Sequence, residues 1–171
     1  MFIGRLAAIS ILLAVAIIAA PALALDPGEN APVFDLEDQF DKPWSLTALK
    51  GNVVVLIAAT PKSGEAMDPW VSSLNEKYGT GIKLVGMMDL HRLPGIIRSV
   101  AKSRIKKETQ QPLMLDFSGS ASKAYGANDK NPVVVVIDKD SKVQAVAGSH
   151  SEEGLASVTT VIDKLLGARS D

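Results

Sequence analysis

Two continuous apolar runs dominate the pattern of hydrophobic and polar positions along this 171-residue chain. Residues 53–59 read VVVLIAA and residues 133–137 read VVVVI, so both runs are rich in β-branched valine. Runs of this length and composition predict strands that are buried on both faces of a sheet. Two further apolar segments, at residues 82–88 and 112–116, predict two more strands.

Turn-forming residues predict two hairpins around these strands. The polar turn at residues 138–141 predicts that residues 143–147 return antiparallel to the second buried strand. A shorter hairpin is expected near the N-terminus, where residues 33–36 form one strand and Trp44 begins the returning one.

Apolar residues at helical spacing predict three longer helices. The first spans residues 61–78, and Pro69 inside it predicts a kink or a break near Asp68. The second spans residues 92–107 and is amphipathic, and the third begins at Ser151 as a helix cap followed by two glutamates. The apolar positions are Leu93, Ile96, Ile97, Val100 and Ile105 in the second helix, and Leu155, Val158, Val161, Ile162 and Leu165 in the third. Strands that alternate with helices in this way predict a single α/β domain with a mixed sheet.

The first 24 residues have the layout of a secretory signal peptide. Arg5 supplies a positive charge, an apolar stretch follows, and Ala22-Leu23-Ala24 after Pro21 forms a small-x-small cleavage site. We therefore expect a signal peptide at residues 1–24, a folded domain at 25–171, and a periplasmic or secreted protein. The alternative is that residues 6–25, which carry no charge, stay uncleaved and anchor the chain in the inner membrane.

Composition and charge exclude several classes of function. The net charge of −1 gives no reason to expect a nucleic-acid partner. The chain has no cysteine, which excludes disulfides, thiol catalysis and thiolate metal sites. The two histidines, His91 and His150, fall in predicted turns, where solvated side chains are the usual case. Residues 138–142 lack the glycine and the final glutamate of a calcium loop. We therefore expect no metal and no cofactor.

Basic residues concentrate in the second predicted helix and the turn before it. A solvated helix face is the usual meaning of such a run, and the sharper alternative is a surface for anionic lipid or another polyanion. Apart from an uncleaved N-terminal segment, this would be the only membrane contact that the sequence suggests. The residues are Arg92, Arg98, Lys102, Arg104, Lys106 and Lys107.

The most informative turn follows the first buried strand and consists of Thr60, Pro61, Lys62, Ser63, Gly64 and Glu65. Pro61 ends the strand and suits the first turn of a helix, whose unpaired N–H groups would point forward from the sheet. Ser63 would need a neighbouring base to act as a nucleophile, and its surroundings do not match the Gly-x-Ser-x-Gly pattern. A helix-capping role is therefore favoured.

Two segments of the chain resemble the thioredoxin-like redoxins, the class that contains peroxiredoxins and thiol-disulfide proteins. The first runs from Ala31-Pro32-Val33-Phe34-Asp35-Leu36 to the strand at 53–59, and the second from Asn131-Pro132 to Asp140. The second segment and the last helix are also similar to the periplasmic YtfJ-like proteins. The resemblance implies a thioredoxin-like three-layer α/β/α domain with a mixed central sheet. It also implies a cis Asn131–Pro132 bond packed close to Lys62 and Gly64.

The departure from the redoxins concerns their reactive residue. Peroxiredoxins carry Thr-Pro-x-Cys where this chain has Thr60-Pro61-Lys62-Ser63. Because a serine hydroxyl does not cycle through sulfenic acid or disulfide, the redox activity is not implied.

We therefore expect a binding or accessory module of the cell envelope. Its degenerate active-site face, residues 60–65 with Asn131 and Pro132, would hold an unknown peptide, protein or anion. One alternative is redoxin-like enzyme activity that depends on a partner's thiol or on a non-thiol site. Another is a structural protein without a ligand.

Overall fold

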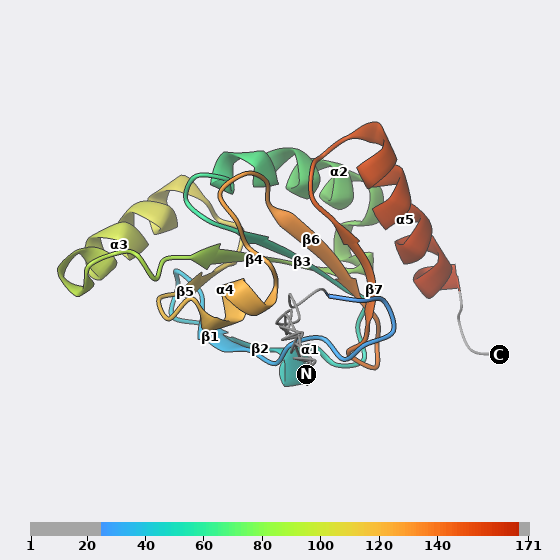
Figure 1. Ribbon diagram of the computed structural model, residues 1–171, viewed down its shortest axis with the longest axis horizontal. Coiled ribbons are helices and arrows are strands. Elements are labelled where there is room, and N and C mark those ends of the chain that lie inside the picture. The colour runs from blue at the N-terminus through green and yellow to red at the C-terminus, as the bar shows by residue number, and fades with distance from the viewer. Residues whose placement is uncertain (1–24, 168–171) are drawn as a thin grey trace, which may run out of the picture.

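A five-stranded mixed sheet with the strand order β5-β4-β3-β6-β7 forms the middle layer of the computed structural model, which describes residues 25–167 (Figure 1). Strands β4 and β5 run parallel to β3, whereas β6 runs antiparallel to β3 and β7 antiparallel to β6. All five strands predicted from the sequence are therefore present. Their bounds are β3 Val54–Ala59, β4 Lys83–Asp89, β5 Leu113–Asp116, β6 Val133–Ile137 and β7 Val143–Ala147.

Strand β3 lies at the centre of the core, and each of its residues is at most 1% exposed. Alternate side chains point to opposite faces of the sheet, so β3 contributes to two separate hydrophobic clusters. Leu56 packs in one cluster with Phe34 and Tyr125, and Ile57 packs in the other with Trp70. Burial on both faces is the physical reason for the uninterrupted apolar run at 53–59.

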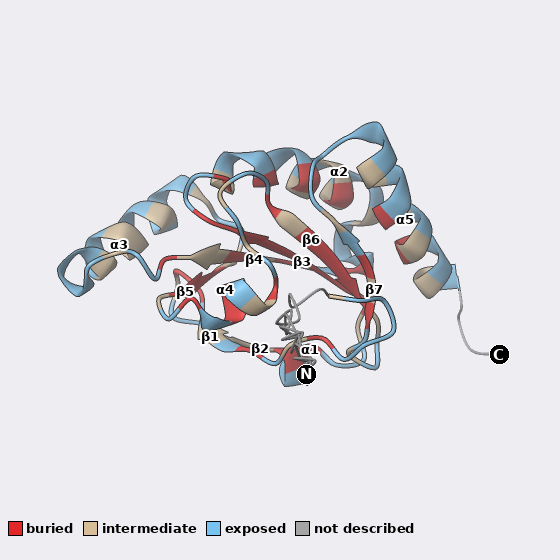
Figure 2. Cartoon of the chain, viewed as in Figure 1, coloured by how far each residue is buried: buried red, intermediate tan, exposed pale blue. Residues whose placement is uncertain are grey.

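Helices α2 (Asp68–Tyr78) and α5 (Glu152–Gly167) cover one face of the sheet, as Figure 1 shows. The opposite face is covered by smaller elements. They are the hairpin of β1 (Asp35–Glu37) and β2 (Pro43–Ser45), the single-turn helix α1 (Leu46–Leu49) and helix α4 (Ser120–Ala124). Figure 2 places the most buried residues between these layers. The predicted three-layer arrangement is confirmed.

The first predicted helix is shorter than expected. Residues 61–63 form a turn, Gly64–Met67 form a 3₁₀ turn, and α2 begins only at Asp68. The predicted break near Asp68 is confirmed, but Pro69 lies in the first turn of α2 rather than inside a longer helix. A proline fits there because the first N–H groups of a helix have no acceptor within the helix.

The second predicted helix is present, but its start and its packing differ from the expectation. Helix α3 (Arg98–Glu108) follows a 3₁₀ turn at Gly95–Ile97 and so begins later than the predicted residue 92. A start at residue 92 is disfavoured because Pro94 opposes a helical conformation in the residue before it. None of the α3 residues is buried, and the helix projects beyond the β5 edge of the sheet (Figures 1 and 2). Its apolar side chains therefore do not join the core.

The predicted signal peptide, residues 1–24, lies outside the described residues. Within residues 25–167, none of the helices combines the length and the apolar character needed to cross a lipid bilayer.

Candidate functional site

The turn after β3 is closed by its own serine. The Ser63 hydroxyl oxygen accepts a hydrogen bond from the Thr60 N–H at 3.1 Å and donates one to the Asn128 carbonyl at 2.7 Å. The residue is 2% exposed. Both histidines are engaged elsewhere, since the ring of His91 bonds Asp89 and that of His150 bonds Ser73. Ser63 is therefore a structural group that pins the turn to the loop before β6.

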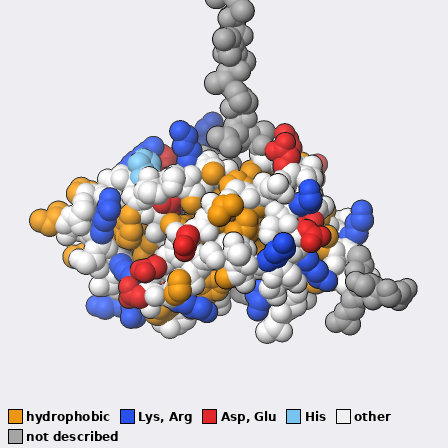
Figure 3. All heavy atoms as spheres, turned by 90° about the horizontal axis from the view of Figure 1, so that it is seen from below, with side chains coloured by type: hydrophobic (Ala, Val, Ile, Leu, Met, Phe, Trp, Pro, Cys, Tyr) orange, Lys and Arg blue, Asp and Glu red, His pale blue; other side chains and the backbone are white. Residues whose placement is uncertain are grey.

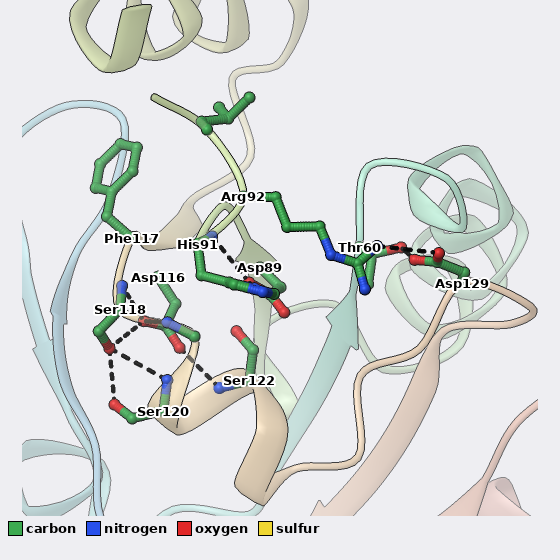
Figure 4. Close-up of polar contacts among 12 residues, drawn as sticks. Thr60, Asp89, His91, Arg92, Asp116, Phe117, Ser118, Ser120, Ser122 and Asp129 are labelled. Carbon is green, nitrogen blue, oxygen red and sulfur yellow. Dashed lines mark hydrogen bonds and ion pairs between the residues drawn. The ribbon is translucent and has the colours of Figure 1, made fainter. Parts of the chain in front are cut away.

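The carboxylate of Asp129 binds three side chains beside the same turn. It accepts from the Thr60 hydroxyl at 2.9 Å, from Lys62 at 2.9 Å and from Arg92 at 3.3 Å (Figure 4). The hydrogen bond from Lys62, followed by that from Thr60, lowers the pKa of Asp129 to about 2. Asp129 is therefore ionised at any physiological pH, and part of the charge of Lys62 and Arg92 is neutralised locally.

The six predicted residues of the turn do not share one face. Thr60, Pro61 and Lys62 line a small hollow of about 180 Å³ beside Arg92. Gly64 and Glu65 line a different, mostly apolar groove of about 330 Å³, which runs along α2 toward β5 and α3. Ser63 lies buried between the two. The predicted face is therefore divided by the turn itself.

The expected cis bond before Pro132 is wrong, because every peptide bond among residues 25–167 is trans. The reason lies in the loop before it. The side-chain oxygen of Asn128 accepts the N–H groups of Lys130 at 3.0 Å and of Asn131 at 3.2 Å, so an Asn-mediated turn brings the chain into β6. Asn131 is exposed and Pro132 is buried, and the hydrogen bonds to the Ser63 turn come from Asn128 and Asp129.

A larger hollow of about 790 Å³, lined mainly by residues of polar or charged type, opens beside Asp129 at the carboxyl ends of β3, β4 and β5. Four loops and helix α4 line it, and three cations, Arg92, Lys123 and Lys130, lie around it with the two carboxylates of Asp89 and Asp129. Figure 4 shows the Arg92 side chain reaching from the β4 end toward Thr60 and Asp129. The other lining residues are His91, Ser118, Gly119, Ser120, Ala127, Asn128 and Thr60.

Gly119 and His91 lie against each other on one side of this hollow. The ring nitrogen Nδ1 of His91 is 2.7 Å from Asp89 Oδ1, so the carboxylate fixes the orientation of the imidazole. Gly119 has φ +75°, and a Cβ at this position would lie 2.8 Å from His91 Cβ. Glycine is therefore required at 119 both by the backbone conformation and by the space that the imidazole occupies.

Asp116 orders the loop between β5 and α4, part of which lines the hollow. Its fully buried carboxylate accepts the N–H groups of Ser118, Gly119 and Ser122 at 2.8–3.0 Å (Figure 4). Burial alone would raise the pKa of Asp116, but the hydrogen bonds from Ser122, Ser118 and Gly119 outweigh it and lower the pKa. Asp116 thereby holds the β5–α4 loop in the shape that lines the hollow.

Sequence reasoning missed most of the residues that line this hollow. Asp89, which lines the hollow, and Asp116, which holds the loop after β5, end two neighbouring parallel strands. Because the carboxyl ends of parallel strands meet at one edge of a sheet, this signal was present in the sequence. Asn128 and Asp129 lie in an irregular loop without any periodic pattern, and their contact with the Ser63 turn becomes visible only in the folded chain.

The fold places this chain in the thioredoxin-like class. A protein assigned as thiol:disulfide interchange protein DsbE from Chlorobium tepidum is 22% identical, with a TM-score of 0.65, 84% of this chain and 100% of that one covered. The exposed lipoprotein thioredoxin Etrx1 of Streptococcus pneumoniae is 20% identical, with a TM-score of 0.60, and the match covers 77% of this chain and 99% of that one. Peroxidoxin BcpB of Mycobacterium tuberculosis is 21% identical, with a TM-score of 0.57, and the match covers 86% of this chain and 100% of that one. These likenesses show the fold, which confirms the predicted class.

The chain belongs to the AhpC/TSA family, whose profile matches residues 27–146. A search of curated proteins gives no match. The match covers the closed turn and the hollow but includes no cysteine, because the sequence has none.

Proposed function

We propose that this chain is an exported, non-redox member of the AhpC/TSA family that binds an acidic segment of a peptide or protein partner in the polar hollow beside Asp129. The observation that carries the proposal is the excess of cations around an open hollow, while the neighbouring Ser63 is buried. Within residues 25–167, neither Lys123 nor Lys130 has a carboxylate within 4.0 Å, and both line the hollow. The similarity to YtfJ-like proteins that the sequence suggests is part of this proposal.

The chemistry of the hollow favours carboxylates as ligands. Charge-assisted hydrogen bonds from lysine and arginine to a carboxylate are roughly twice as strong as neutral ones. The hydroxyls of Ser118 and Ser120 also line the hollow on the α4 side, where they hydrogen-bond each other at 2.7 Å. Asp129 already forms ion pairs with Lys62 and Arg92. A ligand would therefore bind mainly to Lys123 and Lys130, whose charge no carboxylate compensates among the described residues.

Fluorescence anisotropy with a labelled hexaglutamate peptide tests the proposal, with hexaglutamine as the neutral control probe. Lys123→Ala combined with Lys130→Ala should weaken hexaglutamate binding by about three- to tenfold, the range expected for two exposed charge contacts. Lys139→Ala with Lys164→Ala removes two exposed lysines outside the hollow and should leave binding unchanged. Binding should also weaken as salt rises.

Asp129→Asn gives the opposite sign in the same assay. The amide oxygen can still accept from the Thr60 hydroxyl, while Lys62 and Arg92 lose their counter-charge. Hexaglutamate should therefore bind more tightly to this variant. No binding at low salt, or equal loss in the two double-lysine variants, would contradict the proposed function.

A further inference from the structure

The outer end of the α3 segment exposes three apolar side chains, Ile96, Ile97 and Val100, which we call the α3 tip. Their exposed fractions are 87%, 42% and 67%. The described residues contain only two other large exposed apolar side chains, Val33 and Val146, and neither belongs to this segment. Figure 3 shows hydrophobic side chains at the projecting end of the molecule, where Figure 1 places α3. Apolar residues gathered at a projecting end mark an interaction surface.

The inner side of α3 is used to hold the helix to the rest of the domain. Lys102 forms an ion pair with Asp41, and the Lys106 ammonium lies 5.4 Å from the centre of the Phe40 ring. Arg98 lies over Phe117, with its guanidinium carbon 5.1 Å from the ring centre. These contacts fix one side of the helix against the β1–β2 turn and the loop after β5, so the opposite side faces away from the domain.

The outward side carries apolar residues at its start and cations farther along. Positions 96, 100, 104 and 107 follow the helical spacing, which places Ile96, Val100, Arg104 and Lys107 on one side. Arg104 pairs with Glu108, while Lys107 has no carboxylate within 4.0 Å among residues 25–167. The whole stretch 92–107 contains six basic residues and no acidic one.

We infer that the α3 tip is a docking surface for a lipid bilayer rich in anionic headgroups. Apolar side chains at a projecting end can enter the boundary between headgroups and acyl chains without any change in the fold. Two cations, Arg104 and Lys107, lie on the same side as Ile96 and Val100, where they can meet lipid phosphates, and Lys107 has no carboxylate partner among residues 25–167. The apolar part is small, so the headgroup charge must supply much of the affinity and binding must depend on salt.

Vesicle sedimentation tests this inference with the full chain. Vesicles of phosphatidylglycerol and phosphatidylcholine are compared with vesicles of phosphatidylcholine alone. Ile96→Ser combined with Val100→Ser should weaken binding to the anionic vesicles by about tenfold or more, since two buried aliphatic side chains are lost from the interface. Val33→Ser is the matched control, because Val33 is 79% exposed at a distance in sequence from the tip.

The absence of cysteine permits a second, local measurement. Ile96→Cys introduces a single cysteine, which can be labelled with an environment-sensitive dye. The fluorescence emission of this dye should shift to the blue when the protein binds anionic vesicles. The same label at Val33→Cys should not shift. This readout separates docking through α3 from any contribution of the apolar residues 6–25, which are the same in both variants.

Three outcomes would overturn the inference. They are no difference between anionic and neutral vesicles at low salt, equal binding by the double-serine variant and the Val33→Ser control, and a label at position 96 that stays in water while the protein sediments. The Lys123→Ala and Lys130→Ala variant should bind vesicles normally, so failure of this inference and failure of the proposed hollow are distinguishable.

Discussion

At the scale of single residues, Ser63 shows how a reactive position can become a structural one. Its hydroxyl lies in the turn that follows β3, where it satisfies the N–H of Thr60 and the carbonyl of Asn128. Thr60 is a buried residue, so an unmet hydrogen bond at its N–H is costly. The side chain therefore contributes to stability rather than to chemistry.

Ser63→Ala should lower the free energy of unfolding by about 1–3 kcal/mol, because it leaves the Thr60 N–H buried without its acceptor. Urea denaturation followed by circular dichroism measures the change. Ser72→Ala, at an exposed position of α2, is the control and should change stability by less than about 0.5 kcal/mol. Equal stabilities of the two variants would show that the Ser63 bonds add nothing.

Ser63→Cys in the same position extends this prediction to chemistry. Burial disfavours a thiolate, so the thiol pKa should lie above its ordinary value near 8.5, and the variant should react slowly with peroxide at neutral pH. Rapid peroxide consumption by this variant would instead show that the turn still supports redox catalysis.

At the scale of elements, the boundary of α2 depends on Pro69. The helix begins at Asp68, so the proline occupies its first turn, where a missing N–H breaks no helical hydrogen bond. The preceding residues form a tighter 3₁₀ turn that carries Gly64 past Met88, and a Cβ at position 64 would lie 3.1 Å from the Met88 terminal methyl. The close packing of this turn leaves little room for a continuous helix from Pro61.

Pro69→Ala should lower the free energy of unfolding by at most about 1 kcal/mol, the entropic effect of releasing a proline in the unfolded chain. Leu74→Ala in the same helix removes a fully buried side chain and should cost about 2–5 kcal/mol. Thermal or urea unfolding of both variants measures the contrast. A stabilisation of about 3 kcal/mol by Pro69→Ala would mean that the proline strains a helix interior.

At the scale of the whole molecule, the ends of three parallel strands and the loop before β6 meet at one edge of the sheet and form the hollow. The α3 tip projects beyond the β5 edge of the same sheet (Figure 1). The proposed ligand site and the proposed docking surface therefore use different residues of one domain, and each can be altered without the other.

Export is the property of the whole chain that remains a prediction from sequence. Mass spectrometry of envelope protein should find a mature N-terminus at Leu25 or close to it. Ala22→Arg with Ala24→Arg should block processing, because the cleavage site needs small residues, while Leu23→Gln should be processed normally. A full-length wild-type chain in the membrane fraction would support the anchor formed by residues 6–25.

The sequence by itself determined the strands, the three-layer class and the loss of thiol chemistry. Burial on both faces forces an uninterrupted apolar run on β3 and β6, and such a run is visible without any structure. The absence of cysteine is likewise complete information about one kind of chemistry.

Only the tertiary structure decided the candidate site. The bonds from Ser63 to Asn128 and from Lys62 to Asp129 join residues more than 60 positions apart, and the loop that brings them together has no periodicity to interpret. The exposure of α3 could not be predicted from the sequence for the same kind of reason. Helical spacing of apolar residues shows that a helix has an apolar face, but what covers that face depends on how the other elements pack.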